Sequence, residues 1–227
     1  MPPSKRTPLP PPNSVLRQSL ALITPPATEP VTLAEAKAWA RVDGTEEDAI
    51  FTALITAARQ AAEEFLRRSL ITQTWKLTLD LCAGANKPWW DGVREGAMSS
   101  LYGGLPGSVP LPKGPVQSIS SVVTYDLNNA ASTFAASNYR VDASGDRLLL
   151  NYGAVWPSNV RPEAGCEITY VAGYGAAAAV PQPIKTGILT HVAALYEQRG
   201  QCDDPSALPP AALSLYGRYR VMGDRLG

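Results

Sequence analysis

The sequence predicts an α+β protein with a helical bundle core, an inserted antiparallel β region and an extended, proline-rich N-terminal arm. Three observations carry this prediction. Helical periodicity dominates residues 31–70 and 181–227. Between them, residues 71–180 change to a period of two, with turn residues separating short strands. Nine prolines stand in residues 1–30, and such a chain favours extended geometry over packing.

The composition is that of a folded, loop-rich protein with balanced charge. The 227 residues include 20 basic and 20 acidic side chains, and 45% are hydrophobic, which is enough for a sizeable core. Balanced charge argues against a protein that grips nucleic acid, because such a protein usually carries a basic excess. Gly and Pro interrupt the charge-free stretches, so we expect neither a membrane-spanning helix nor a secretion signal. Three distant cysteines are expected to be free thiols, and these are Cys82, Cys166 and Cys202.

Residues 1–30 are expected to form an arm that reaches another molecule. Val15, Leu16 and Leu20 belong to an apolar patch that is too short to fold alone. Polyproline geometry rises ~3.1 Å per residue, so the part of the arm before Leu22 could span on the order of 60 Å. Two interpretations stay open: a docking arm that becomes ordered on assembly, and a disordered leader.

Two helices are expected before the β region. Thr32 and Glu35 have the spacing of a capping box, which predicts a short helix after them. Thr45 and Asp48 have the same spacing and predict the start of a long helix over about 46–68. The apolar residues of the long helix form two adjacent stripes, wide enough to contact helices on two sides, and these are Ile50, Leu54, Ala57, Ala61 and Phe65, and Phe51, Ile55, Ala58, Ala62 and Leu66.

The β region is expected to be antiparallel, with a long loop near its start. Strands are expected at about 71–79, 117–126, 138–142, 147–151 and 166–171. The loop over 83–108 is rich in Gly, contains Trp89 and Trp90, and is longer than compact domains usually allow. Helices over about 183–199 and 210–221 then complete the helical core.

We expect no catalytic, cofactor-binding or metal-binding residues. His191 is the only histidine, which excludes a multi-histidine metal site, and we expect it to be a packed, hydrogen-bonded structural residue. Gly173 and Gly175 follow a predicted strand as in a dinucleotide-binding turn, but the third glycine and the parallel strand-helix-strand unit are missing. The chain is therefore not expected to be an enzyme.

Two groups of residues are candidate interface residues. Trp89 and Trp90 could anchor a partner or a sugar, or one ring could tuck over the sheet. The C-terminal group combines the Tyr and Arg types that are enriched at interfaces, and its members are Tyr216, Arg218, Tyr219, Arg220, Met222 and Arg225. Alternatively, its tyrosines pack on the preceding helix and its arginines are solvated. Residue types alone thus indicate an interaction protein.

Several segments, in collinear order, resemble the head-tail connector (adaptor) proteins of long-tailed phages and gene transfer agents. They begin with ITPPATEPVTLAEAKAWARVDGTEEDAI and continue with LPKGPVQSISSVVTYD, YRVD, ITYVAGYG, VPQPIKTGILTHVAALYEQRG and the closing LPPAALSLYGRYRV. The resemblance covers about residues 22–200 and the terminal helix. Residues 1–21 and the loop over 83–108 depart from the family pattern.

The resemblance implies a structural subunit without a cofactor. It implies a homo-oligomeric ring of twelve copies beneath the portal protein, with a further connector, stopper or tail protein below, and DNA passing through the channel without specific binding. The implied location is the head-tail joint of the virion, after assembly in the host cytoplasm and away from any membrane. The C-terminal group would then contact the portal. A second class of function stays open, a carbohydrate- or peptide-binding β module that uses Trp89 and Trp90.

Overall fold

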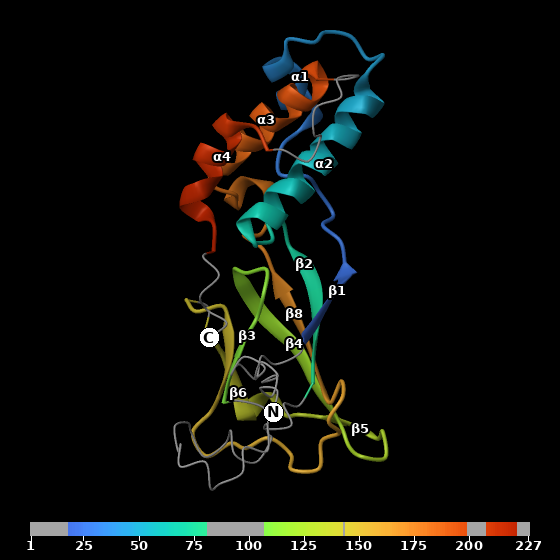
Figure 1. The fold of residues 1–227 in the computed structure, drawn as a ribbon, viewed down its shortest axis with the longest axis vertical. Helices are drawn as coiled ribbons and strands as arrows, with labels where there is room; N and C mark the ends of the chain where they lie inside the picture. Colours follow the sequence, from blue (N-terminus) through green and yellow to red (C-terminus); the bar gives the residue numbers. More distant parts are fainter. Residues whose placement is uncertain (1–17, 81–106, 143, 199–207, 222–227) are drawn as a thin grey trace, which may run out of the picture.

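The computed structural model describes residues 18–80, 107–142, 144–198 and 208–221, which form an elongated molecule with a helical lobe at one end and a β lobe at the other (Figure 1). The mixed α+β class is as predicted. The helices are α1 (Leu33–Ala40), α2 (Asp48–Leu66), α3 (Gln182–Glu197) and α4 (Pro210–Tyr216), with short 3-10 helices η3 (Ala136–Asn138), η4 (Ala177–Ala179) and η5 (Gly217–Tyr219).

In the helical lobe, α3 packs against α1, α2 and α4. One predicted apolar stripe of α2 is fully buried there, and its members are Phe51, Ile55, Ala58, Ala62 and Leu66. The other stripe stays open: Ile50 and Ala57 are exposed, and Leu54 and Phe65 are half-buried. The described helices α1, α3 and α4 all contact α2, and within a single copy they leave its second stripe only partly covered.

Of the two predicted capping boxes, one forms. The Thr32 hydroxyl accepts the Glu35 N–H at 3.2 Å and the Glu35 carboxylate accepts the Thr32 N–H at 2.7 Å, so the start of α1 is confirmed. The box predicted at Thr45 and Asp48 is wrong, because the N-cap of α2 is Glu47 without a side-chain cap. Asp48 instead forms an ion pair with Lys37 of α1, a contact that local spacing does not encode.

The β lobe consists of two antiparallel sheets. The larger has the order β1-β2-β8-β4-β5 and the smaller the order β3-β7-β6. Their strands are β1 (Gln18–Thr24), β2 (Gln73–Leu79), β3 (Ser108–Pro110), β4 (Val116–Tyr125), β5 (Ala131–Thr133), β6 (Tyr139–Asp142), β7 (Arg147–Leu150) and β8 (Cys166–Ala172). The antiparallel arrangement is as predicted. A core lies between the sheets and is built around Leu77, Leu148, Ile168 and Tyr170.

β1 corrects the prediction of one extended arm over residues 1–30. This strand pairs with β2 along its whole length, and Gln18 lies opposite Leu79. Further along, Glu29 forms an ion pair with α2 and Val31 is buried in the helical lobe. The alternation of QSLALIT was the available signal for a strand, but the proline count of the surrounding sequence outweighed it. Val15 and Leu16 lie outside the described residues.

A buried carboxylate joins the two lobes. Glu63, near the end of α2, accepts the Leu70 N–H at 2.8 Å and the Gln73 side-chain N–H at 2.7 Å on one oxygen, and the Arg59 guanidinium at 2.9 Å on the other. Arg59 also donates to Glu29 at 2.7 Å. Burial raises the pKa of Glu63, against the Leu70 N–H and the Arg59 charge, which lower it. One side chain thus fixes α2, β2 and the chain before α1 together.

Backbone hydrogen bonds complete this junction. The Ser69 N–H donates to the carbonyls of Lys113 and Gly114, and the Tyr174 N–H donates to the carbonyl of Leu70. Gly173 has φ +128°, and a Cβ there would lie 2.3 Å from the Ile71 carbonyl oxygen. The pair Gly173 and Gly175 is therefore a tight exit from β8 toward the helical lobe, as opposed to a phosphate-binding turn.

The ring of Tyr216, at the end of α4, packs directly against Gly187 of α3 and holds α4 in place. Tyr216 is fully buried, and a Cβ on Gly187 of α3 would lie 2.4 Å from its ring. The Val221 N–H then donates to the carbonyl of Leu66, which ties the end of this segment to α2. The C-terminal helix is thus part of the helical core.

Replacing Glu63 tests the junction. Glu63→Ala removes one of the two carboxylates that pair with the buried Arg59, and it leaves the Leu70 N–H and the Gln73 side-chain N–H without their acceptor. We therefore expect it to lower the free energy of unfolding by about 3–5 kcal/mol. Glu63→Gln keeps one acceptor oxygen and should cost less, about 1–3 kcal/mol. The matched control is Glu64→Ala, next in sequence but exposed, which should stay within about 0.5 kcal/mol. Urea unfolding measures all three, and equal effects at both positions would contradict the account.

Replacing Gly187 tests how α4 docks. Gly187→Ala should lower the free energy of unfolding by about 1–3 kcal/mol, because its methyl group meets the Tyr216 ring. Gly217→Ala is the control, since a Cβ there has no atom within 4 Å. Thermal unfolding, with limited proteolysis of the α4 segment, measures the difference. A Gly187→Ala variant as stable as the wild type would mean that the contact is dispensable.

Candidate functional site

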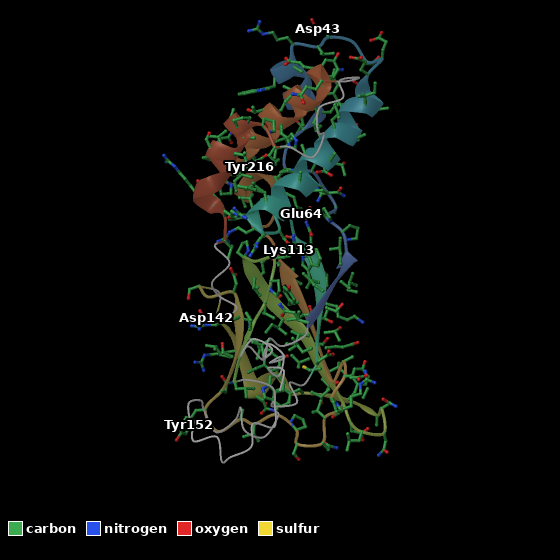
Figure 2. All side chains as sticks on the ribbon, viewed as in Figure 1. Asp43, Glu64, Lys113, Asp142, Tyr152 and Tyr216 are labelled. Carbon is green, nitrogen blue, oxygen red and sulfur yellow. The ribbon has the colours of Figure 1, made fainter. Side chains whose placement is uncertain are left out.

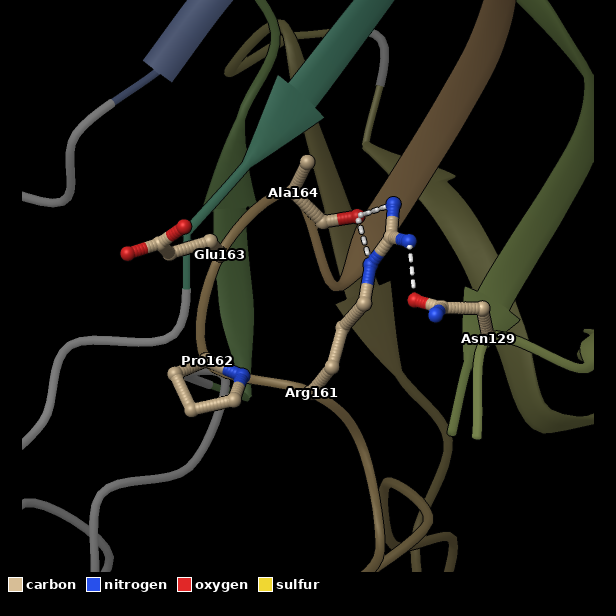
Figure 3. A pocket seen from close by; sticks show the side chains of 5 residues that line it. All are labelled: Asn129, Arg161, Pro162, Glu163 and Ala164. Atoms are coloured by element: carbon tan, nitrogen blue, oxygen red, sulfur yellow. Dashed lines mark hydrogen bonds between the residues drawn. The ribbon is translucent and has the colours of Figure 1, made fainter. Parts of the chain in front are cut away.

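A shallow hollow lies at the end of the β lobe far from the helices, lined by residues 129 and 161–164 (Figure 3). Its one cation is already engaged. Arg161 donates to the Ala164 carbonyl at 3.0 Å and to the Asn129 side-chain oxygen at 2.8 Å, and its guanidinium lies 4.4 Å from the centre of the Tyr125 ring. Glu163 points away from Arg161. The hollow is therefore braced by Arg161, whose guanidinium is already used in contacts within the chain.

The described residues contain no reactive arrangement. They hold no group of three or more His, Cys, Asp or Glu side chains that could bind a metal. None of the described helices is long and apolar enough to cross a membrane. Cys166 is a buried free thiol, and its burial together with the neighbouring Glu167 charge raises its pKa to about 12, which makes it unreactive.

His191 is packed inside the helical lobe, as predicted. Only 4% of its surface is exposed, and among the described residues its Nδ1 has no hydrogen-bond partner. The packing of His191 is thus confirmed, whereas its predicted hydrogen bonding is not met at Nδ1. Burial lowers the pKa of His191, because the charged imidazolium loses its hydration.

The structure disperses the predicted C-terminal group. Tyr216 is buried in the helical core, so in a single copy it is a packing residue. The Tyr219 carbonyl accepts a hydrogen bond from Arg68, and Arg220 lies 4.7 Å from the centre of the Phe65 ring. Arg218 is exposed. The remaining members, Met222 and Arg225, lie outside the described residues.

Of the other predicted interface residues, only one can be placed. Leu20 lies on β1, half-buried against the core of the β lobe. Trp89 and Trp90, on which the alternative of a carbohydrate- or peptide-binding module rests, lie outside the described residues, as does most of the loop over 83–108. Cys82 and Cys202 also lie outside the described residues.

A basic cluster lies at the waist between the lobes, and the sequence did not reveal it. Its five members, called here the waist cluster, are Arg67, Arg68, Lys113, Arg218 and Arg220. The backbones of Arg68 and Lys113 form an isolated parallel β-bridge, and the Arg68 side chain donates to the Tyr219 carbonyl at 2.9 Å. Lys113 is labelled at the junction of the lobes in Figure 2. The sequence does not reveal this cluster, because its members come from three separate segments of the chain and the net charge is zero.

Large exposed apolar side chains lie elsewhere on the described surface. On the helical lobe and on β1 they are Trp39, Ile50, Leu22 and Ile23, and in the turns of the β lobe they are Leu127, Tyr152 and Val155. Tyr152 marks the far end of the β lobe in Figure 2. Such side chains are candidates for burial against other molecules.

A family model described as the phage gp6-like head-tail connector protein matches residues 30–153. The match covers more than half of the 227 residues. The chain therefore belongs to the phage gp6-like head-tail connector family, and its role is that of a structural connector in the virion. The resemblance noted in the sequence is confirmed.

Solved structures show the same fold. A chain in the neck of an empty gene transfer agent (GTA) particle, computed with C6 symmetry, has a TM-score of 0.66 and 23% identity, with 91% of this chain and 99% of that chain covered. A chain in the virion of the native GTA particle has a TM-score of 0.65, 23% identity and 91% and 98% coverage. A chain in the neck of the native particle, computed with C12 symmetry, has a TM-score of 0.60, 23% identity and 91% and 99% coverage. No curated protein matches.

The buried histidine predicts a pH dependence of stability. Because the pKa of His191 is lower in the folded chain, the unfolded chain binds the proton more readily, and stability falls as the pH drops through about 6.5. His191→Met should therefore lose less unfolding free energy than the wild type between about pH 7 and about pH 5. Urea unfolding at both pH values measures this, and other groups such as Glu63 are common to both proteins. Equal losses would contradict the assignment.

Proposed function

We propose that this protein is a connector subunit that forms a closed ring beneath the portal, joins the head to the tail and leaves a channel for DNA. The observation that carries the proposal is membership of the head-tail connector family. The shared fold with chains of GTA necks that were computed with C6 and C12 symmetry supports a ring of twelve copies. The ring would reside at the head-tail joint and assemble in the host cytoplasm.

Surfaces left open in the single copy support lateral assembly. The outward face of α2 carries exposed Ile50, Ala53 and Ala57, and small side chains allow another helix to approach closely. On β1, Leu22 and Ile23 remain 45% and 53% exposed although the strand is paired on one side. A ring places the same copy in contact with two neighbours through two different surfaces. These two faces are our candidates for that pair of contacts.

For the portal contact we propose the end of the chain, residues 222–227, which includes Met222 and Arg225. The described part of the C-terminal group supports this narrower choice, because Tyr216 is buried within the helical core. We place the next connector, stopper or tail protein on the opposite side of the ring.

Deleting residues 222–227 tests the portal contact. The truncated chain keeps Tyr216, Arg220 and the Val221 N–H bond to Leu66, so it should fold with an unchanged melting temperature. We expect it to lose co-purification with the portal of the same particle, while the full chain is retained. The matched control is Met222→Ala/Arg225→Ala in a chain of full length, which separates loss of these side chains from loss of length. Undiminished retention of the truncated chain would contradict the portal contact, and failure of the full chain to bind would contradict the connector role.

A further inference from the structure

We propose that the waist cluster contacts the phosphate backbone of duplex DNA. The proposal rests on the proposed function, because the cluster must line the DNA path of the assembled connector. It adds a site to that function: a set of cations that touches the passing DNA, in a protein whose net charge is zero.

Three segments bring the cations together. Arg67 and Arg68 end α2, Lys113 precedes β4, and Arg218 and Arg220 flank Tyr219. The contacts that connect these segments are the Arg68–Lys113 bridge, the Arg68 bond to the Tyr219 carbonyl and the Val221 N–H bond to Leu66. Arg67, Arg218 and Arg220 are exposed, and Arg68 and Lys113 are half-buried. The cluster thus presents at least three cations to solvent.

Carboxylates do not neutralise the cluster. Within the described residues, none of its five members forms an ion pair. Lys113 donates to the backbone carbonyl of Glu63 at 3.4 Å, and Arg220 lies over an aromatic ring, so these partners are neutral. Among the described residues, Asp146 and Glu64 are the carboxylates close to the cluster that Arg59 does not already pair, since the Glu63 carboxylate is bonded to Arg59. Asp146 accepts the Val116 N–H at 2.8 Å, and Glu64 is exposed on α2.

The end of α2 accounts for only part of this charge. A helix C-terminus carries roughly half a negative elementary charge, and Arg67 and Arg68 complement it. Five cations against that half charge and two carboxylates leave an excess of positive charge at the waist. Four of the five are arginines, whose planar guanidinium matches phosphate oxygens in pairs.

The surroundings favour DNA over an acidic protein surface. Protein contacts that bind tightly usually centre on exposed aromatic or aliphatic side chains. The large exposed apolar residues of the described surface lie on the helical lobe, on β1 and in the turns of the β lobe, and none lies among the cluster. Phosphate contacts need no apolar centre, because released counterions supply the affinity.

The test is fluorescence anisotropy of the full chain with two duplexes of unrelated sequence. If about four phosphates are contacted, affinity should fall roughly a hundredfold between about 50 mM and about 200 mM salt and should be equal for both duplexes. Arg67→Gln/Arg218→Gln/Arg220→Gln should reduce the slope of log affinity against log salt by about 2–3. The matched control is Arg41→Gln/Lys76→Gln/Arg140→Gln, which removes the same charge from exposed or half-buried sites elsewhere and should keep the slope.

The proposal is overturned by an unchanged slope in the waist variant, by preference for one sequence, or by an equal loss in the control, which would reflect net charge alone. It is also overturned by a waist variant that binds DNA normally but no longer co-purifies with the portal. The last result would assign the cluster to an acidic protein surface. Should the triple variant misfold, Arg218→Glu serves alone, since Arg218 is exposed. Portal co-purification of the wild type with no DNA binding would reject this site and leave the connector role intact.

Discussion

The buried Glu63 carboxylate is the contact on which the arrangement of the two lobes depends. A carboxylate with 8% of its surface exposed is tolerated only when its oxygens are bonded. The donors come from α2 itself, from the Leu70 backbone and from Gln73 at the start of β2. Through Arg59 the same group reaches Glu29, just before α1. The helical lobe and the β lobe are thereby joined through one hydrogen-bonded group.

The waist depends on this junction. α2 ends there, the Ser69 N–H reaches across to the turn before β4, and the Tyr216 ring on Gly187 brings the last described segment alongside. These contacts use backbone groups and the Tyr216 ring, and Arg67 and Arg218 beside them stay exposed. The exposed Ile50 of α2 and Leu22 of β1 take no part in these contacts.

The sequence predicts the local elements well and the long-range contacts poorly. Periodicity located α2, α3 and most strands within two residues, because one buried face determines each pattern. It missed β1, because this edge strand buries neither face fully and the prolines around it indicate an extended arm. It missed the waist cluster for another reason: spatial grouping of Arg67, Lys113 and Arg218 follows from tertiary contacts that composition cannot show. Tyr216 has the residue type of an interface but fills the space that Gly187 leaves open.

The most direct test of the connector account is electron microscopy of the purified chain mixed with the portal of the same particle. The account predicts a closed ring of this chain, stacked coaxially on the portal, with an open central channel. Each copy in the ring should contact its neighbours through α2 and β1, while the bonds around Glu63 remain as they are in the single chain. Particles that show bare portals, or single copies scattered without symmetry, would contradict it.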